Sequence, residues 1–92
     1  MADVTVTTGY PQMIGTIGQL SVYLWKLTDI DDGEILATGL GDRIQAFFVQ
    51  PETDPSTNTS AGINAVNASG TITFYPGVDN LSADLIVLAT GM

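Results

Sequence analysis

The chain has 92 residues, 45% of them hydrophobic and 13% charged, a size and composition that allow one compact domain with a modest core. Ten acidic residues against two basic ones give a net charge of −8, which repels nucleic-acid phosphates and anionic lipid head groups. We therefore expect neither a nucleic-acid partner nor a membrane partner.

The first third of the chain is rich in strand signals. Alternating valine and threonine over 4–7 predicts a short strand, or an N-terminal arm within 1–9 that adds to a neighbouring sheet. Glycines interrupt the apolar stretch 13–18, so no element is predicted there. The run 20–28 is rich in β-branched and aromatic residues and predicts a strand. Aspartates and a glycine over 29–34 then predict a turn.

The middle of the chain contains a second strand and a polar loop. Residues 35–40 are compatible with a short strand or with one helical turn. The run 43–50 is apolar and aromatic, and it predicts a strand that Pro51 ends. The Ser/Thr/Asn-rich stretch that follows has little to pack with, which predicts a mobile loop over 51–61.

The last third of the chain predicts a hairpin and a final strand. Strand-like residues over 63–66 and 71–75 flank a turn that contains Gly70, and 84–90 is an apolar strand. Short strands at this spacing predict a single small antiparallel β-sandwich or barrel of about six or seven strands, formed by residues 1–92.

Three of these strands are apolar on both faces, although only one face of each sheet in a two-layer domain meets the core. Local loops over 10–18 and 76–83 could cover the second face. The alternative that we favour is a subunit interface, because large exposed apolar patches are rare on monomers. Its expected anchors are mostly aromatic, as interface anchors commonly are: Tyr23, Trp25, Leu27, Phe47 and Val49.

The chain contains no histidine and no cysteine. This removes the usual general base, the usual nucleophile and most transition-metal ligands, and it excludes disulfides. Because no glycine-rich phosphate loop is present either, we expect no enzyme activity, no catalytic residue and no cofactor.

One acidic cluster invites a metal hypothesis. Carboxylates in close sequence are suitable for calcium, and four occur together, at Asp29, Asp31, Asp32 and Glu34. Their spacing departs from the helix-loop-helix calcium pattern, because the glycine falls one position early and no glutamate closes the loop. A solvated acidic turn is the simpler interpretation, so no metal site is predicted, and the calcium alternative stays open.

Several stretches of the chain resemble small β-rich virion proteins of tailed bacteriophages. They are the Thr/Val start, the run LTDIDDGEILATGL at 27–40, an aromatic strand, a Ser/Thr/Asn loop and GTITFY at 70–75. The resemblance implies a capsid decoration or cement protein that stabilises the outer head shell. It also implies a homo-oligomer, with a trimer favoured, and contact with the major capsid protein or another virion protein.

The implied location is the outer capsid surface, after synthesis in the host cytoplasm. The first five residues lack the basic start and apolar run of a secretory signal, which agrees with that expectation. A rival interpretation is a carbohydrate-binding or adhesion β-sandwich, in which Trp25, Tyr10 or Tyr75 would stack on a sugar.

Overall fold

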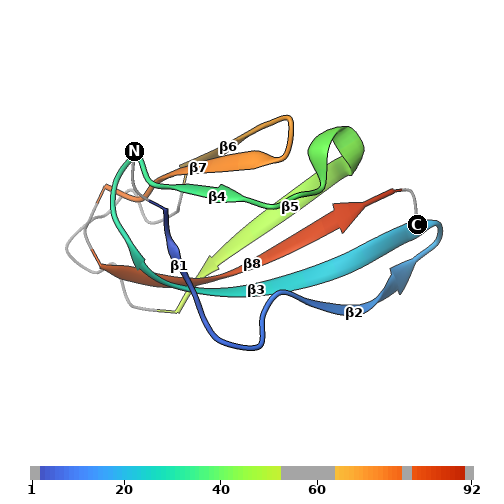
Figure 1. The fold of residues 1–92 in the computed structure, drawn as a ribbon, viewed down its shortest axis with the longest axis horizontal. Coiled ribbons are helices and arrows are strands. Elements are labelled where there is room, and N and C mark those ends of the chain that lie inside the picture. The colour runs from blue at the N-terminus through green and yellow to red at the C-terminus, as the bar shows by residue number, and fades with distance from the viewer. Residues whose placement is uncertain (1–2, 53–63, 78–79, 91–92) are drawn as a thin grey trace.

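A computed structural model describes residues 3–52, 64–77 and 80–90. Strands make up 67% of it, no α-helix occurs in this part of the chain, and two antiparallel sheets pack as a β-sandwich (Figure 1). The predicted all-β fold is confirmed. Most of the predicted loop over 51–61 lies outside the described residues.

The larger sheet contains five strands and the smaller sheet contains three. The larger one has the order β1-β3-β8-β5, with β2 also paired to β3, and its members are β1 (Thr5–Val6), β2 (Gln12–Ile17), β3 (Leu20–Ile30), β5 (Ile44–Pro51) and β8 (Leu81–Ala89). The smaller one has the order β4-β7-β6, from β4 (Ile35–Ala37), β6 (Asn64–Ala68) and β7 (Thr71–Tyr75). A 3-10 turn, Gly41–Arg43, joins β4 to β5.

The described residues thus form eight strands, rather than about six or seven, partly because residues 12–17 form β2. This strand pairs with the start of β3 as a hairpin, and the hairpin extends beyond the sandwich at the right of Figure 1. All six residues of β2 are exposed. Strand formation here follows from pairing with β3, because the glycines of this stretch carry no strand preference of their own.

Strand β3 also runs further than its apolar pattern indicates, to Ile30. Asp29 adopts a left-handed conformation with φ 54°, and the register with β8 shifts between Leu27 and Ile30. An irregularity of this kind lets a strand continue past a polar residue. The turn predicted over 29–34 is therefore confined to residues 31–34, where the Asp31 amide donates to Glu34 Oε1 at 2.9 Å.

The predicted hairpin is confirmed as β6 and β7. Ser69 and Gly70 lie between them with φ values of 51° and 94°. Two successive positive φ angles are characteristic of the tight turns that match the twist of paired strands. The Asn67 side chain accepts a hydrogen bond from the Gly70 amide at 2.9 Å and so stabilises this turn.

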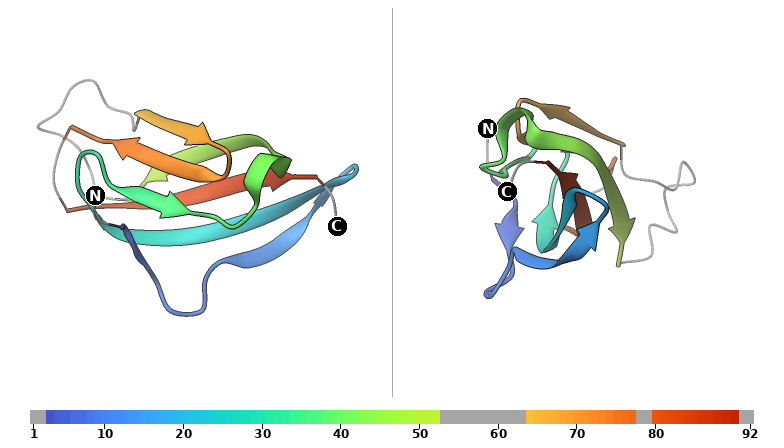
Figure 2. Two further views of the ribbon diagram at one scale, coloured as in Figure 1. Left: turned by 45° about the horizontal axis from the view of Figure 1, so that its top comes forward. Right: turned by 90° about the vertical axis from the view of Figure 1, so that its right-hand side faces the viewer.

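The N-terminal segment closes one side of the sandwich. The Val4 amide donates to the Ile35 carbonyl of β4 at 2.9 Å, and the Thr7 amide donates to the Lys26 carbonyl of β3 at 2.8 Å. Residues 3–7 therefore pass from one sheet to the other, as Figure 2 shows, and they pair within their own chain rather than serving as an arm for a neighbour.

Candidate interaction surface

The five residues expected to anchor an interface lie on the inner face of the larger sheet. Trp25 is 3% exposed and Leu27 is 1% exposed, and both belong to the hydrophobic core. Tyr23, Phe47 and Val49 are partly buried and pack against that core. The interface assignment is therefore corrected: these side chains hold the sandwich together.

The smaller sheet explains why this face is buried. Its central strand, β7, contributes Ile72 and Phe74, which are both fully buried in the same core cluster as Trp25. Large aromatic side chains fill the space between two packed sheets efficiently. The aromatic side chains that suggested an interface between subunits therefore pack between the two sheets of one domain.

The alternate residues of the larger sheet form its second apolar surface. Cross-strand pairs place Val22 beside Leu88 and Leu24 beside Ile86, and β5 continues these rows. Directly paired residues point to the same side of a sheet. We define the outer apolar face as the six residues of these two rows, Val22, Leu24, Ala46, Phe48, Ile86 and Leu88.

Exposure differs across the outer apolar face. Phe48 is 60% exposed, Val22 is buried, and the other four residues are half-buried. Of the two stretches that could have covered this face, residues 12–17 pair with β3 as β2, and 81–83 form the start of β8. Residues 12–17 and 81–83 therefore belong to the sheet itself, and residues 78–79 of the second stretch lie outside the described part of the chain.

An ion-pair cluster borders the outer apolar face. Lys26 Nζ lies 3.0 Å from Asp84 Oδ1 and 3.3 Å from Glu52 Oε2. Hydrogen bonds to Asp84 and Glu52 raise the pKa of Lys26 above its usual 10.5. Burial opposes ionisation of Asp84, but hydrogen bonds with Glu52 and Lys26 outweigh it and hold the pKa of that carboxyl below its usual 3.8.

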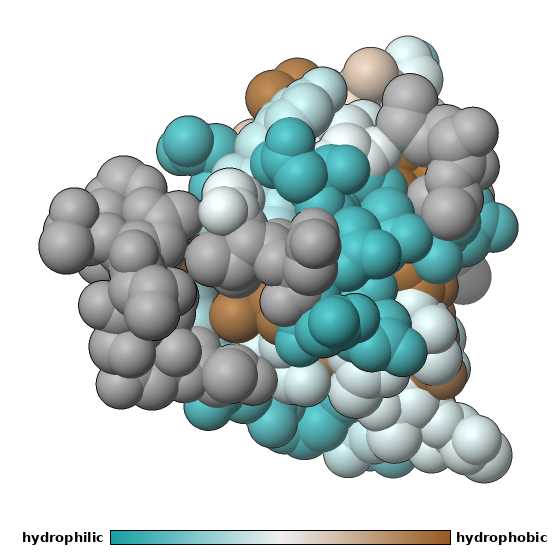
Figure 3. All heavy atoms as spheres, turned by 90° about the vertical axis from the view of Figure 1, so that its left-hand side faces the viewer, coloured by the Kyte–Doolittle hydropathy of each residue, from teal (hydrophilic) through white to brown (hydrophobic). Residues whose placement is uncertain are grey.

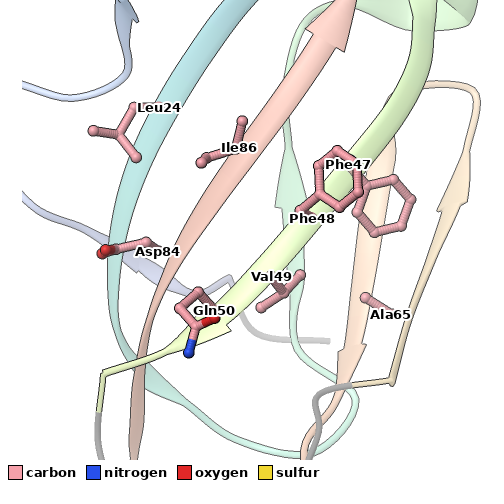
Figure 4. Close-up of a pocket in the computed structure, with 8 residues that line it drawn as sticks. All are labelled: Leu24, Phe47, Phe48, Val49, Gln50, Ala65, Asp84 and Ile86. Carbon is pink, nitrogen blue, oxygen red and sulfur yellow. The ribbon is translucent and has the colours of Figure 1, made fainter.

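A groove of about 720 Å³ runs along β5. Phe48, Gln50, Asp84, Ile86 and Leu24 line it from the outer side of the sheet (Figure 4). Phe47 and Val49 line it on the inner side of β5, together with Ala65 of β6. The groove therefore lies at the side of the sandwich where β5 and β6 form the last strands of their sheets.

The acidic turn has a structural role. Asp31 Oδ1 accepts a hydrogen bond from the Asn80 amide at 2.9 Å, and Asp32 Oδ1 accepts one from the Gly77 amide at 3.4 Å. These bonds attach the segment before β8 to the turn after β3. Across the described ranges, acidic side chains do not gather in threes or more as a metal site would require. Where Figure 3 colours the surface at that end of the molecule, it is mainly hydrophilic.

The aromatic rings considered for sugar stacking have different surroundings. Trp25 is enclosed by the core and cannot stack on a ligand in the folded chain. Tyr10 is half-buried, whereas Tyr75 is 46% exposed on the outer side of the smaller sheet. Phe48 is more exposed than any of these three rings. Side chains alternate along a strand, so placing Phe47 against the core would have predicted that Phe48 is exposed.

No protein-family model, no curated protein and no solved structure matches this chain. Within residues 3–52, 64–77 and 80–90, no helix has the length and apolar character needed to cross a membrane.

Proposed function

We propose that this protein is a structural component of a tailed-bacteriophage virion, a decoration or cement protein on the outer surface of the head. The observation that carries the proposal is the outer apolar face, two rows of apolar side chains on a sheet whose other side already meets the core. A surface of this kind is stabilised when another protein covers it.

The remaining properties of the chain favour a structural partner over a substrate. Apart from the Lys26 cluster at its border, the outer apolar face has no charged side chain, and an open sheet face is suited to another protein surface rather than to a small molecule. The charge of −8 is compatible with the outside of a shell and unfavourable beside packaged DNA.

The proposed partners are the major capsid protein or another virion protein, together with further copies of this chain. In this arrangement the outer apolar face docks on the shell, and its two residues on the central strand β8, Ile86 and Leu88, contribute the apolar contact. The acidic turn at the far end of β3 remains in solvent, where its charges keep the particle soluble.

The location is tested with an antibody raised against the purified protein and applied to phage particles released from cells that carry the gene. Gold labels over intact heads are expected. Labels confined to tails, or particles without the protein, would overturn head decoration.

The docking surface is tested by supplying variants to particles that lack the protein. Ile86→Lys places a charge at the centre of the outer apolar face and should abolish binding to the head. Val66→Lys is the matched control, because Val66 is 57% exposed and belongs to the smaller sheet, away from this face. Equal binding of both variants would contradict docking through the outer apolar face.

A further inference from the structure

Within the part of the chain that the structure describes, strand β5 is an unpaired edge. It is the last strand of the larger sheet and has eight residues, whereas β6, the neighbouring edge of the smaller sheet, has five. Natural edge strands are usually shortened, bulged or charged so that they do not pair with another chain. Strand β5 has a bulge between Ile44 and Ala46 and ends at Pro51, but between these two points its register is regular and it contains no charged side chain. The chain as a whole carries −8, so two copies repel each other, but β5 itself adds no local charge to that repulsion.

The hydrogen-bonding direction of β5 follows from the bonds at its two ends. The Glu52 amide donates to the Ser82 carbonyl at 2.7 Å, and the Thr90 amide donates to the Arg43 carbonyl at 2.9 Å. Both bonds use even-numbered residues of the β8 segment. In an antiparallel ladder every second residue bonds the same neighbour, so Leu88, Ile86 and Asp84 face β5.

The partners of those residues on β5 are Ala46, Phe48 and Gln50. The backbone groups of Phe47 and Val49 must then point away from β8, towards the free edge. No strand of the described residues pairs with that edge. The edge therefore offers two amide donors and two carbonyl acceptors in regular spacing, which is what an added strand requires.

We propose that β5 pairs antiparallel with β5 of a second copy of this chain, about a two-fold axis at Phe48. In this register Phe47 of one copy faces Val49 of the other and exchanges both backbone hydrogen bonds with it. At the centre, Phe48 of one copy faces Phe48 of the other. The two residues form a non-hydrogen-bonded pair, and in pairs of this type the side chains approach most closely. A two-fold interface of this kind uses the same patch on both copies.

Side-chain exposure agrees with this register. Phe48 is 60% exposed at the middle of an uncharged strand, a position where a free aromatic ring gains most from a symmetric contact. Ala46 would face Gln50 of the other copy, which leaves room beside the two rings. The groove along β5 is lined by Phe47, Phe48 and Val49, so pairing would also cover its apolar walls. The inference concerns self-association: it replaces the trimer that the resemblance implies with a two-fold dimer, and it does not depend on the virion role.

A cysteine cross-link tests the register. The chain contains no cysteine, so Phe48→Cys introduces a single thiol at an exposed position. The proposed central pair has Cα atoms about 4.5 Å apart, within the range that a disulfide spans. Oxidation with oxidised glutathione should convert most of this variant into a covalent dimer.

The matched control is Gln50→Cys, an exposed residue on the same strand and the same side of the sheet. In the proposed register it faces Ala46, so its two copies lie four residues apart, about 13 Å along the strand. It should remain monomeric on a non-reducing gel. Equal cross-linking of both variants would show random collision and overturn the register.

Solution mass tests the association itself. Light scattering on the unmodified protein should give twice the monomer mass, and the dimer should strengthen between about 0.01 M and about 1 M salt because salt screens the repulsion between two acidic chains. A monomer throughout this range, or a trimer, would overturn the two-fold pairing. Either result leaves head labelling and docking to be judged by their own experiments.

A charge exchange separates edge pairing from other contacts. Phe48→Lys and Phe48→Glu should each be monomeric, because each would place like charges at the two-fold axis. An equimolar mixture of the two should recover dimers, since opposite charges then meet. If the unmodified chain is dimeric but the mixture does not associate, the interface lies elsewhere on the molecule.

Discussion

Lys26 and Asp84 are direct cross-strand partners of β3 and β8, and their Nζ and Oδ1 atoms lie 3.0 Å apart. Glu52, directly after β5, joins them through Lys26. The cluster therefore connects three neighbouring strands, at the border of the outer apolar face. Its side chains remain 25–44% exposed, so its contribution to stability is modest and depends on salt.

This cluster predicts a loss of stability in acid. The folded pKa of Asp84 lies below 3.8, so the contribution of its carboxylate is present above pH 3.8 and disappears as the pH falls through the folded value. Asp84→Asn should therefore destabilise the protein at neutral pH, and its difference from the unmodified chain should shrink below pH 3.8. Urea unfolding at a series of pH values measures this difference. A difference that is independent of pH would contradict the assignment.

Lys26 predicts the opposite dependence at high pH. Its folded pKa lies above 10.5, so its contribution is present below pH 10.5 and is lost as the pH rises through the folded value. Lys26→Met should remove this alkaline dependence while keeping the apolar stem of the side chain. The check is the urea midpoint of both proteins between neutral and alkaline pH, which should converge above the folded pKa.

The two aromatic residues Trp25 and Phe48 should respond very differently to truncation. Trp25 is 3% exposed in the core, so Trp25→Ala should lower the free energy of unfolding by about 3–5 kcal/mol, enough to unfold a domain of this size. Phe48→Ser removes a ring that is 60% exposed and should change it by less than about 0.5 kcal/mol at low protein concentration. Far-UV circular dichroism during urea unfolding measures both. A folded, stable Trp25→Ala protein would contradict the core assignment.

The contrast between these two residues shows how far the sequence alone could be interpreted. The long runs 20–28 and 43–50 were identifiable as strands because β-branched and aromatic residues favour extended backbone. Their period-2 alternation also separated two faces correctly. The sequence could not show which of the two faces meets the core. On β3, one face has Leu20, Val22 and Leu24, and the opposite face is equally apolar. A single strand also carries no information about the side on which a second sheet lies.

Strand β2 and the end of β3 were missed for a different reason. The glycines at 15 and 18 weaken any local strand signal, and the hairpin forms because β3 offers a long edge to pair with. Likewise Asp29 is a turn residue by preference, yet the pairing of Ile30 with Leu81 keeps the strand going beyond it. In both places the pairing between strands outweighs the local conformational preference. Short-range sequence patterns contain no record of this pairing.

The hydroxyl of Thr38 lies at one end of the smaller sheet and connects the segment after β4 to the β6–β7 turn. It donates to the Gly70 carbonyl at 2.6 Å and accepts a hydrogen bond from the Leu40 amide at 3.2 Å. Thr38→Val keeps the shape but removes both bonds, so it should lower the free energy of unfolding by about 1–3 kcal/mol. Thr38→Ser retains the hydroxyl and should cost clearly less. Equal effects in urea unfolding would mean that the hydroxyl is not the stabilising group.

Gly70 predicts a larger loss, because it lies against the backbone of Gly41. A Cβ added at Gly70 would be 2.5 Å from the Gly41 nitrogen, and backbone atoms cannot move aside as a flexible side chain could. Gly9 is the matched control, since its φ of 93° is almost the same as the 94° of Gly70, while a Cβ there meets nothing within 4 Å. Both Gly→Ala changes carry the strain of a positive φ, about 1 kcal/mol.

Gly70→Ala should therefore be more destabilising than Gly9→Ala, by at least about 1–2 kcal/mol, the usual effect of overpacking. Urea unfolding of the two variants against the unmodified chain isolates the contact between the two glycines, because the conformational strain is common to both. Equal losses would mean that the β6–β7 turn moves freely away from Gly41. A larger loss for Gly70→Ala would show that this turn is fixed against the segment that leads from the smaller sheet into β5.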